Sequence, residues 1–329
     1  MPVTVAMYDK AFEEIGEQLN ALNLDITVHT FGRDGKFVVN GVAMAPGEVD
    51  VDYFWLSNDI YNGDFKEGAF DTVLACKSVG VLQTFNAGLD DPLYKAMSER
   101  GTRIINSSAQ AVAISEFVMA HVLSLVHPID LQREQQAAKH WETTPFRELS
   151  RMNWLIIGYG PIGQELSRRV KSFGSSITVV RRSPQTSDLV DEAGTMADLQ
   201  RFLPNADVIV LACPLNNATR GFADQRFFSA IKKDALLVNI ARGPLIDDAA
   251  LLAALDSGRL AHAVLDVFHT EPLPKEDPLW SHPNVRLTPH TSFAGNGARG
   301  RWVQLFLDNI TRFVNGETLA SEVKPQDIV

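Results

Sequence analysis

The hydrophobic positions of the chain fall in short apolar runs separated by helix-compatible segments. In the first third of the chain the runs are VTVAM (3–7), LDITVHT (24–30), VDYFWLS (51–57), VGVLQTF (79–85) and RIIN (103–106). Short apolar strands that alternate with helical segments are typical of a parallel α/β sheet. The pattern therefore predicts a first, small parallel sheet here.

A second series of apolar runs follows a segment that is apolar nearly all round, SEFVMAHVLSLV (115–126). Such a segment predicts a buried helix, which could carry the chain between two domains. The runs of the second series are NWLIIG, SITVV, DVIVLA, ALLVNI, AHAVLDV and NVRLTP. Six runs in this arrangement predict a six-stranded nucleotide-binding sheet.

The last part of the chain predicts a helix that returns to the first sheet. In RWVQLFLDNITRFV the large apolar residues recur at helical spacing. We therefore expect an α/β protein with two parallel-sheet domains. The first domain would comprise residues 1–106 and 296–329, and the second would comprise residues 107–295.

Length, charge and cysteine content narrow the functional class. At 329 residues the chain exceeds the usual size of one core, and its formal net charge of -10 argues against a nucleic-acid partner. We see no stretch of membrane-spanning length and no signal-peptide pattern at the N-terminus. Cys76 and Cys213 lack the spacing of a metal site or a disulfide framework. We expect a cytoplasmic protein without a metal site or a membrane partner.

A dinucleotide-binding pattern follows the first run of the second series. Gly158-Tyr159-Gly160-Pro161-Ile162-Gly163 stands directly after NWLII and opens a helix-compatible segment. The first glycine permits a tight turn, the second lets the backbone approach a pyrophosphate, and the third allows close packing of helix on strand. An ordinary strand-turn-helix is the other interpretation, but the flanking strands favour a dinucleotide site.

The residues after the second strand of this series predict which dinucleotide is preferred. An acidic residue there would accept hydrogen bonds from the ribose 2'-hydroxyl and repel a 2'-phosphate. This chain instead has Arg181, Arg182 and Ser183. Two guanidinium groups and a hydroxyl suit a phosphate, although solvated surface arginines are the simpler interpretation. We predict NADP(H) over NAD(H), with NAD(H) still possible.

Three ionisable residues each follow one of the later runs: Arg242 after ALLVNI, Glu271 after AHAVLDVF and His290 after NVRLTP. Because the carboxyl ends of strands in an open α/β sheet face the ligand, these residues can meet over one substrate. A guanidinium can hold a carboxylate, an imidazole can protonate a forming alkoxide, and a carboxylate can orient the imidazole. Each could be structural by itself. Together they predict reduction of a 2-oxo acid.

Ordered motifs along nearly the whole chain resemble those of the D-isomer-specific 2-hydroxyacid dehydrogenases. They are GYGPIG, PLNNATRGF, NIARGPLIDDAALLAAL, AVLDVFHTEP and TPHTS. The resemblance implies a flavodoxin-like substrate-binding domain and a Rossmann dinucleotide-binding domain, with the active site in the cleft between them. It also implies that Arg242 binds the substrate carboxylate and polarises its carbonyl, that His290 is the acid/base, and that Glu271 assists His290.

The resemblance further implies a set of cofactor contacts. Asp266, in VLDVF, would contact the nicotinamide carboxamide, although by spacing alone it could equally be a strand-end acid satisfied by its neighbours. The remaining candidates lie around the nicotinamide ring and in the PLNNAT segment. They are Cys213, Pro214, Thr219, Ile240 and Ala241.

The family also places a substrate loop after the fourth strand of the first domain, which here is residues 85–90. Ala87 and Gly88 would offer backbone N–H groups to the substrate carboxylate, and Asn86 would tune side-chain preference. A plain turn is the other interpretation. Trp55 could line the pocket or belong to the core.

These observations lead us to expect an NADPH-dependent reductase of glyoxylate or hydroxypyruvate that yields the D-2-hydroxy acid. The resemblance implies a homodimer. Two other functions remain open. One is an NAD-linked member of the same scaffold with another substrate, such as a formate or phosphonate dehydrogenase. The other is a dinucleotide-sensing protein of the corepressor type.

Overall fold

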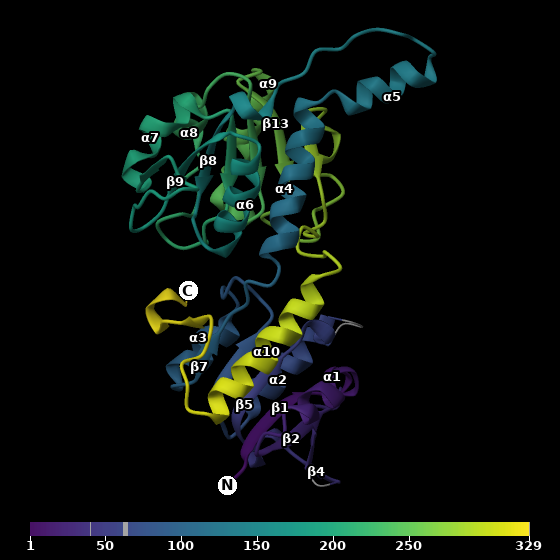
Figure 1. Cartoon of the computed structure of the whole chain (residues 1–329), viewed down its shortest axis with the longest axis vertical. Helices are drawn as coiled ribbons and strands as arrows, with labels where there is room; N and C mark the ends of the chain where they lie inside the picture. Colours follow the sequence, from purple (N-terminus) through teal and green to yellow (C-terminus); the bar gives the residue numbers. More distant parts are fainter. Residues whose placement is uncertain (40, 62–64, 329) are drawn as a thin grey trace. The chain divides into compact units, whose positions relative to one another are not determined.

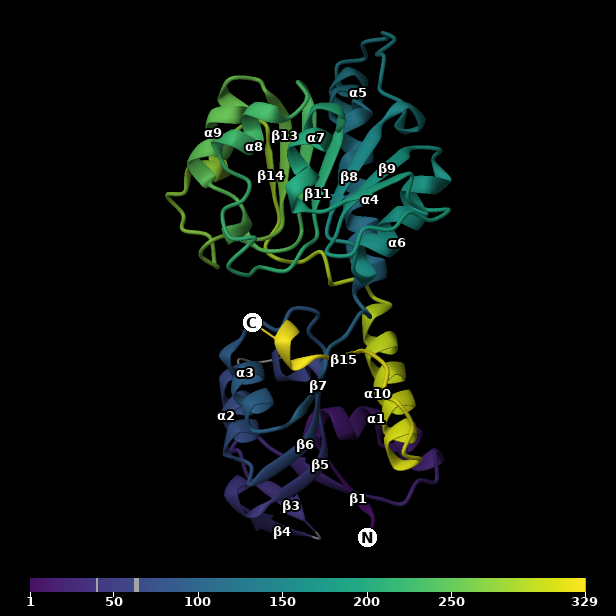
Figure 2. The ribbon, with the colours of Figure 1, turned by 90° about the vertical axis from the view of Figure 1, so that its left-hand side faces the viewer.

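The computed structural model of the chain describes residues 1–39, 41–61 and 65–328. It divides into two compact units. Unit 1 comprises Met1–Ala109 and Asn296–Val329, and unit 2 comprises Gln110–Gly295. Each unit contains one sheet with helices on both faces (Figures 1 and 2).

The sheet of unit 1 has the strand order β15-β7-β6-β5-β1-β2-β3-β4. Its five central strands are parallel and stand in the chain order 2-1-3-4-5, which is the flavodoxin-like arrangement. The strands are β1 (Val3–Tyr8), β2 (Ile26–Phe31), β3 (Phe37–Val39), β4 (Val42–Met44), β5 (Asp50–Leu56), β6 (Ser78–Thr84), β7 (Arg103–Ile105) and β15 (Glu322–Val323). The antiparallel additions β3, β4 and β15 were not predicted from the sequence.

The helices of unit 1 cover both faces of this sheet (Figure 2). They are α1 (Asp9–Ala21), α2 (Lys66–Ala75), α3 (Pro92–Glu99) and α10 (Ala298–Val314). The last helix packs on β5, where the ring of Phe306 stacks on Trp55 at a centroid distance of 4.3 Å. Trp55 is only 2% exposed and therefore belongs to the core of unit 1.

The sheet of unit 2 is parallel throughout, with the order β10-β9-β8-β11-β12-β13-β14. Its strands are β8 (Asn153–Ile157), β9 (Ser176–Val180), β10 (Glu192–Gly194), β11 (Val208–Leu211), β12 (Ala235–Asn239), β13 (Leu260–Leu265) and β14 (Val285–Leu287). The expected six strands are present, but the sheet has seven. The short edge strand β10 escaped prediction because its sequence, EAG, has no apolar run.

The order of this sheet reverses between β8 and β11. The chain winds outward from β8 to β9 and β10, and then returns to the other side of β8 at β11. In doubly wound sheets, ligands bind beyond the carboxyl ends of the strands at such a reversal. The residues that follow β8 and β11 are therefore placed to form a binding site.

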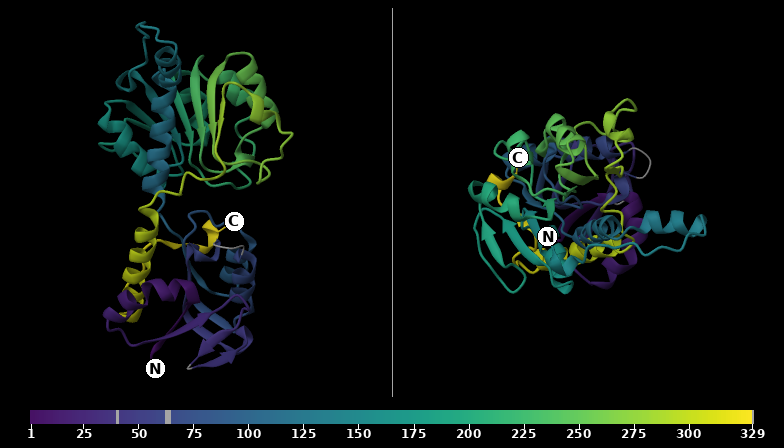
Figure 3. Two further views of the ribbon diagram at one scale, coloured as in Figure 1. Left: turned by 90° about the vertical axis from the view of Figure 1, so that its right-hand side faces the viewer. Right: turned by 90° about the horizontal axis from the view of Figure 1, so that it is seen from above.

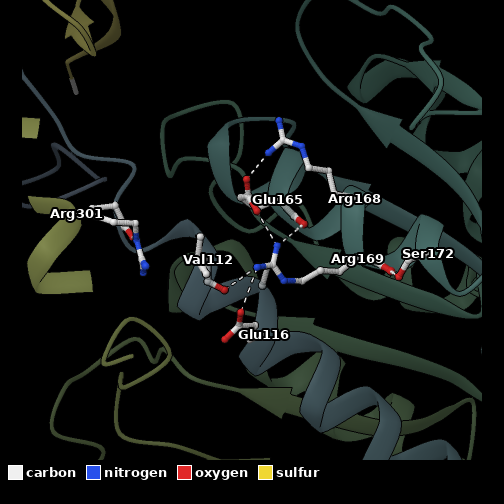
Figure 4. A network of polar contacts seen from close by, with 9 residues as sticks. Val112, Glu116, Glu165, Arg168, Arg169, Ser172 and Arg301 are labelled. Carbon is white, nitrogen blue, oxygen red and sulfur yellow. Dashed lines mark hydrogen bonds and ion pairs between the residues drawn. The ribbon is translucent and has the colours of Figure 1, made fainter. Parts of the chain in front are cut away.

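The helices of unit 2 form a layer on each face of the sheet, with α4 and α6 on one side (Figure 3, left). They are α4 (Ala111–Val126), α5 (Ile129–Ala137), α6 (Pro161–Ser172), α7 (Leu199–Phe202), α8 (Gln225–Ala230) and α9 (Asp248–Asp256). One ion pair, between Arg169 of α6 and Glu116 of α4, joins these two helices, and two further pairs lie within α6 (Figure 4). The guanidinium of Arg169 contacts Glu165 at 2.6 Å and Glu116 at 3.2 Å, and Arg168 contacts Glu165 on its other side.

The segment formed by α5 and the loop after it projects from the rest of unit 2 (Figures 1 and 3). Within the described residues, no single helix combines the length and apolar character needed to cross a membrane. Taken together, α4 and α5 are long and apolar enough to span a membrane by length and composition alone, but the two helices meet at an angle of 55°.

Candidate active site

The turn after β8 has the geometry expected of its three glycines. Gly158 has φ +105°, and a Cβ atom there would lie 2.4 Å from the carbonyl oxygen of Ala212. At Gly163 a Cβ would lie 2.5 Å from the Gly158 carbonyl oxygen, so the third glycine lets α6 approach the strand closely. At Gly160 a Cβ would meet nothing within 4 Å. The turn thus leaves room beside its second glycine at the N-terminus of α6, where unpaired backbone N–H groups favour an anion.

The segment after β9 carries the two arginines. The backbone N–H of Arg181 donates to the Gly194 carbonyl at 2.9 Å, and its guanidinium lies over the ring of Tyr159, 5.4 Å from the centroid. Arg182 and Ser183 are exposed. Because Tyr159 belongs to the glycine turn, this contact ties the basic segment to that turn.

The segment after β11 closes the other side of the glycine turn. Cys213 is buried, and burial raises the pKa of its thiol to about 12, so the sulfur stays protonated and unreactive. Cys76 in unit 1 is also buried, and burial again raises the pKa of the thiol to about 12. The hydroxyl of Thr219 donates to the Pro214 carbonyl at 2.7 Å and accepts from the backbone N–H of Asn216 at 2.8 Å. Thr219 therefore shapes the turn that follows Cys213.

Arg242 is held by a buried side chain that the sequence did not single out. Asn239, at the end of β12, is fully buried. Its amide nitrogen donates to the Arg242 carbonyl at 2.9 Å, and its amide oxygen accepts from the backbone N–H of Ala241 at 3.1 Å. The guanidinium of Arg242 donates to the Ala241 carbonyl at 2.7 Å. Ile240, the first residue after β12, is buried.

The loops after β12 and β13 touch at the main chain. A Cβ on Gly243 would lie 2.0 Å from the carbonyl carbon of Phe268, so only glycine fits at this contact. The backbone N–H of Phe268 in turn donates to Oε1 of Glu271 at 2.9 Å. The loop of Arg242 and the loop of Glu271 are therefore fixed to each other.

His290 and Glu271 form a direct hydrogen-bonded pair. Nδ1 of His290 lies 2.7 Å from Oε2 of Glu271, and both side chains are partly exposed. A carboxylate can only accept, so Nδ1 carries the hydrogen in this pair. Nε2 is then the atom that can give or take a proton.

Asp266, the first residue after β13, is fully buried and accepts three side-chain hydrogen bonds. Its Oδ1 accepts from the Thr288 hydroxyl at 2.6 Å and from the backbone N–H of Thr291 at 2.8 Å. Its Oδ2 accepts from the backbone N–H of Ser292 at 3.0 Å. All three donors lie within two residues of His290. The carboxylate is thus satisfied by the turn that carries the histidine.

The substrate-loop candidates lie in unit 1, and hydrogen bonds from neighbouring residues hold their backbone. The amide nitrogen of Asn86 donates to the Tyr94 hydroxyl at 2.7 Å, and the Asn86 carbonyl accepts from the backbone N–H of Ser107 at 2.9 Å. The Ala87 carbonyl accepts from the Asn106 side chain at 2.9 Å. These bonds fix the backbone on either side of Ala87, and Gly88 follows it directly.

Within unit 2, the structure gathers most of the predicted site residues at the carboxyl ends of five neighbouring strands, β8 and β11 to β14. The residues that sequence reasoning missed are Asn239, Gly243 and Thr288. Each lies inside a motif that carried the family resemblance, and Asn239 and Thr288 are polar residues that end an apolar run. Among the described residues, no group of histidine, cysteine and acidic side chains could hold a metal ion.

Comparisons with known proteins agree with this arrangement. A family model described as D-isomer specific 2-hydroxyacid dehydrogenase, NAD binding domain, matches residues 119–292. Glyoxylate/hydroxypyruvate reductase A of Yersinia enterocolitica is 31% identical over 186 residues, which cover 56% of this chain and 59% of that protein. Hydroxypyruvate reductase of Blautia hydrogenotrophica is 30% identical over 247 residues, with coverages of 72% and 76%.

One similar solved structure is the NADPH-dependent glyoxylate/hydroxypyruvate reductase of Sinorhizobium meliloti in complex with NADP and sulfate. The TM-score is 0.76 at 24% identity, and the match covers 100% of this chain and 99% of that one. At this identity the likeness concerns the fold.

Proposed function

Because the chain belongs to the D-isomer-specific 2-hydroxyacid dehydrogenase family, we propose that it reduces a small 2-oxo acid of the glyoxylate or hydroxypyruvate type to the D-2-hydroxy acid, with NADPH as reductant. The observation that carries this proposal is the His290–Glu271 pair, which leaves Nε2 as the proton-transferring atom on the same sheet edge as the glycine turn. The names of the two reductase relatives support the substrate class.

The residues after β8 and β9 fit a dinucleotide with a 2'-phosphate. A Cβ at Gly160 would meet nothing within 4 Å, as a close approach of a pyrophosphate requires, and no acid stands among Arg181, Arg182 and Ser183 to repel a phosphate. Such a cofactor, when bound, supplies hydride to the carbonyl carbon. We propose that the two arginines give the preference for NADPH.

The proposed roles of the protein groups follow from their chemistry. Arg242 holds the substrate carboxylate and polarises the neighbouring carbonyl, while the backbone N–H groups of Ala87 and Gly88 bind the carboxylate from unit 1. Protonated His290 gives its Nε2 proton to the forming alkoxide, and Glu271 holds the ring through Nδ1. Asp266 would offer its remaining acceptor position to the nicotinamide carboxamide.

A substrate panel tests the reaction. We expect the protein to oxidise NADPH in the presence of glyoxylate or hydroxypyruvate, and weakly with pyruvate or phenylpyruvate. Activity with none of the four would overturn the proposal and favour the dinucleotide-sensing function. Oxidation of formate with NAD would instead indicate the NAD-linked alternative.

The cofactor preference has its own test. Replacing Arg181 and Arg182 with alanine should lower kcat/KM with NADPH about 10- to 100-fold, because charge-assisted bonds to the phosphate are lost, and leave kcat/KM with NADH nearly unchanged. A wild-type preference for NADH would refute this assignment. Replacing the exposed Arg226 in the same unit with alanine is a control for loss of surface charge.

The proposed assembly is a homodimer in the cytoplasm. The projecting segment of unit 2 exposes apolar side chains, with Trp141 fully exposed and Leu131 44% exposed. Covering such side chains with a second copy would remove apolar surface from water. Sedimentation at micromolar concentration should give twice the mass of one chain, and a monomer would contradict the proposed assembly.

A further inference from the structure

His290 has an uncommon backbone conformation. Its φ is +49°, in the left-handed region that residues with a side chain rarely adopt. Its backbone N–H donates to the Thr288 carbonyl at 2.9 Å, which closes a tight turn immediately before the ring. A non-glycine residue keeps such a conformation only when its surroundings impose it.

The carboxylate of Asp266 supplies that constraint. It accepts a hydrogen bond from the Thr288 hydroxyl before the histidine. It also accepts hydrogen bonds from the backbone N–H groups of Thr291 and Ser292 after the histidine. Asp266 itself is fixed in place, because it directly follows β13, is fully buried, and donates its backbone N–H to the Asn239 carbonyl at 3.1 Å. Hydrogen bonds to a charged, buried acceptor are among the strongest in proteins.

We propose that Asp266, acting with Thr288, is the positioning residue for His290: it holds residues 288–292 in the turn that presents Nε2 to the substrate. This inference rests on the proposed function. A carboxylate has about four acceptor positions, and three are used here, so a cofactor contact through Oδ2 remains compatible. The two roles are separable because Thr288 contacts only Oδ1.

The first test is Thr288→Val, which removes the hydroxyl and keeps the shape. We expect kcat for 2-oxo acid reduction to fall about 10- to 100-fold, with the Kd for NADPH unchanged, because the fraction of molecules with a correctly placed ring falls. Thr288→Ser should restore most of kcat. Thr102→Val is the matched control: it removes a buried hydroxyl bond of 2.7 Å in unit 1 and should leave kcat unchanged.

A double-mutant cycle separates positioning from a general loss of stability. If Thr288 acts through the histidine, Thr288→Val should have no further effect on the residual activity of His290→Ala. Independent, multiplicative losses would overturn the proposal. So would a Thr288→Val enzyme with normal kcat, or one whose only defect is weaker NADPH binding.

Hydrogen exchange provides a readout that does not depend on activity. In Asp266→Asn one of the two carboxylate oxygens becomes an NH2 group, which cannot accept, so either the Thr291 or the Ser292 N–H loses its acceptor. The amide hydrogen of at least one of these two residues should exchange at least about tenfold faster than in wild type. Unchanged exchange would overturn the positioning role. Faster exchange in a protein that reduces none of the 2-oxo acids would leave the turn assignment standing and refute the proposed function.

Discussion

The turn after β8 and the turns after β12 and β14 lie at the same edge of one sheet, yet they are built differently. The turn after β8 owes its shape to missing side chains, since neither Gly158 nor Gly163 has room for a Cβ. The turns after β12 and β14 owe their shape to buried side chains, because Asn239 binds the backbone of Ala241 and Arg242, and Asp266 binds the backbone of Thr291 and Ser292. A pyrophosphate is bound by backbone groups, whereas a reacting carbonyl needs side chains held in fixed directions.

This difference predicts which property of the protein is lost when each region is mutated. Changes to the glycine turn should affect cofactor binding and stability. Changes to the buried polar residues should affect turnover.

The largest effect should come from the proton-transferring side chain itself. His290→Ala should lower kcat by about 10²- to 10⁴-fold, because the alkoxide then has no positioned acid. The Kd for NADPH, measured by fluorescence titration, should not change. Near-normal turnover of His290→Ala would contradict the view that side chains in these turns, and not the glycine turn, carry the chemistry.

A smaller effect on turnover is expected at Asn239, the buried side chain that binds the backbone of Arg242. Asn239→Leu keeps the branching of the side chain but leaves the Ala241 N–H and the Arg242 carbonyl without their partner, so the backbone of Arg242 loosens. We expect kcat/KM for the 2-oxo acid to fall about 10- to 100-fold, with a rise in KM, since the substrate carboxylate is held less well. Steady-state kinetics measures this effect, and a change confined to NADPH affinity would contradict it.

The glycine turn allows a matched pair of variants. Gly158→Ala combines a forbidden φ with overlap on Ala212 and should lower the free energy of unfolding by at least about 2 kcal/mol. Gly160→Ala places a methyl group in open space, so stability should change by less than about 1 kcal/mol while the Kd for NADPH rises about tenfold or more. Urea unfolding and fluorescence titration give the two quantities. If both variants changed the unfolding free energy and the Kd for NADPH by the same amounts, Gly158 and Gly160 would not have separate roles.

The smallest expected effect is on stability and concerns the ion pair between Lys171 of α6 and Asp191. Lys171, near the end of α6, lies 2.7 Å from Asp191, which also accepts from the backbone N–H of Ile177 in β9. The hydrogen bond from Lys171, with help from the Ile177 N–H, holds the pKa of Asp191 below its ordinary value. The pair is largely exposed, so Asp191→Asn should cost only about 0.2 to 1 kcal/mol near pH 7.

The pH dependence of that loss has a definite sign. A carboxyl whose pKa is lower in the folded than in the unfolded state stabilises the fold above its unfolded pKa, about 4, and loses that contribution as the pH falls through the folded pKa. The difference in unfolding free energy between wild type and Asp191→Asn should therefore shrink as the pH is lowered below about 4. A difference that grows on acidification would contradict the assignment.

The sequence predicted the parallel sheets because their strands are apolar runs bounded by turns. It missed β3, β4, β10 and β15, which have only two or three residues each and lie near or at sheet edges. Of these, β15 also depends on pairing with β7, a strand far along the chain. The glycine turn could be predicted because a local backbone requirement leaves a local pattern. The flavodoxin-like and Rossmann arrangements came from the family resemblance, and the observed strand orders confirm them.

The site was predicted only in part for a related reason. His290 and Glu271 were expected to meet, and they do at 2.7 Å. Asn239 and Thr288 were not expected, because a polar residue at the end of an apolar run has the same appearance whether it faces solvent or turns inward to bind the backbone. Asp266 was expected to contact a cofactor, and its three bonds to the histidine turn depend on the pairing of β13 with β14, which sequence spacing does not reveal.

The two buried thiols have a practical consequence for labelling. With pKa values near 12, only about one cysteine in 10⁵ is ionised at neutral pH, and both sulfur atoms are shielded by the cores of their units. Maleimide reagents should therefore leave the native protein unmodified. A new surface cysteine introduced in either unit would then accept a dye without prior removal of the native cysteines.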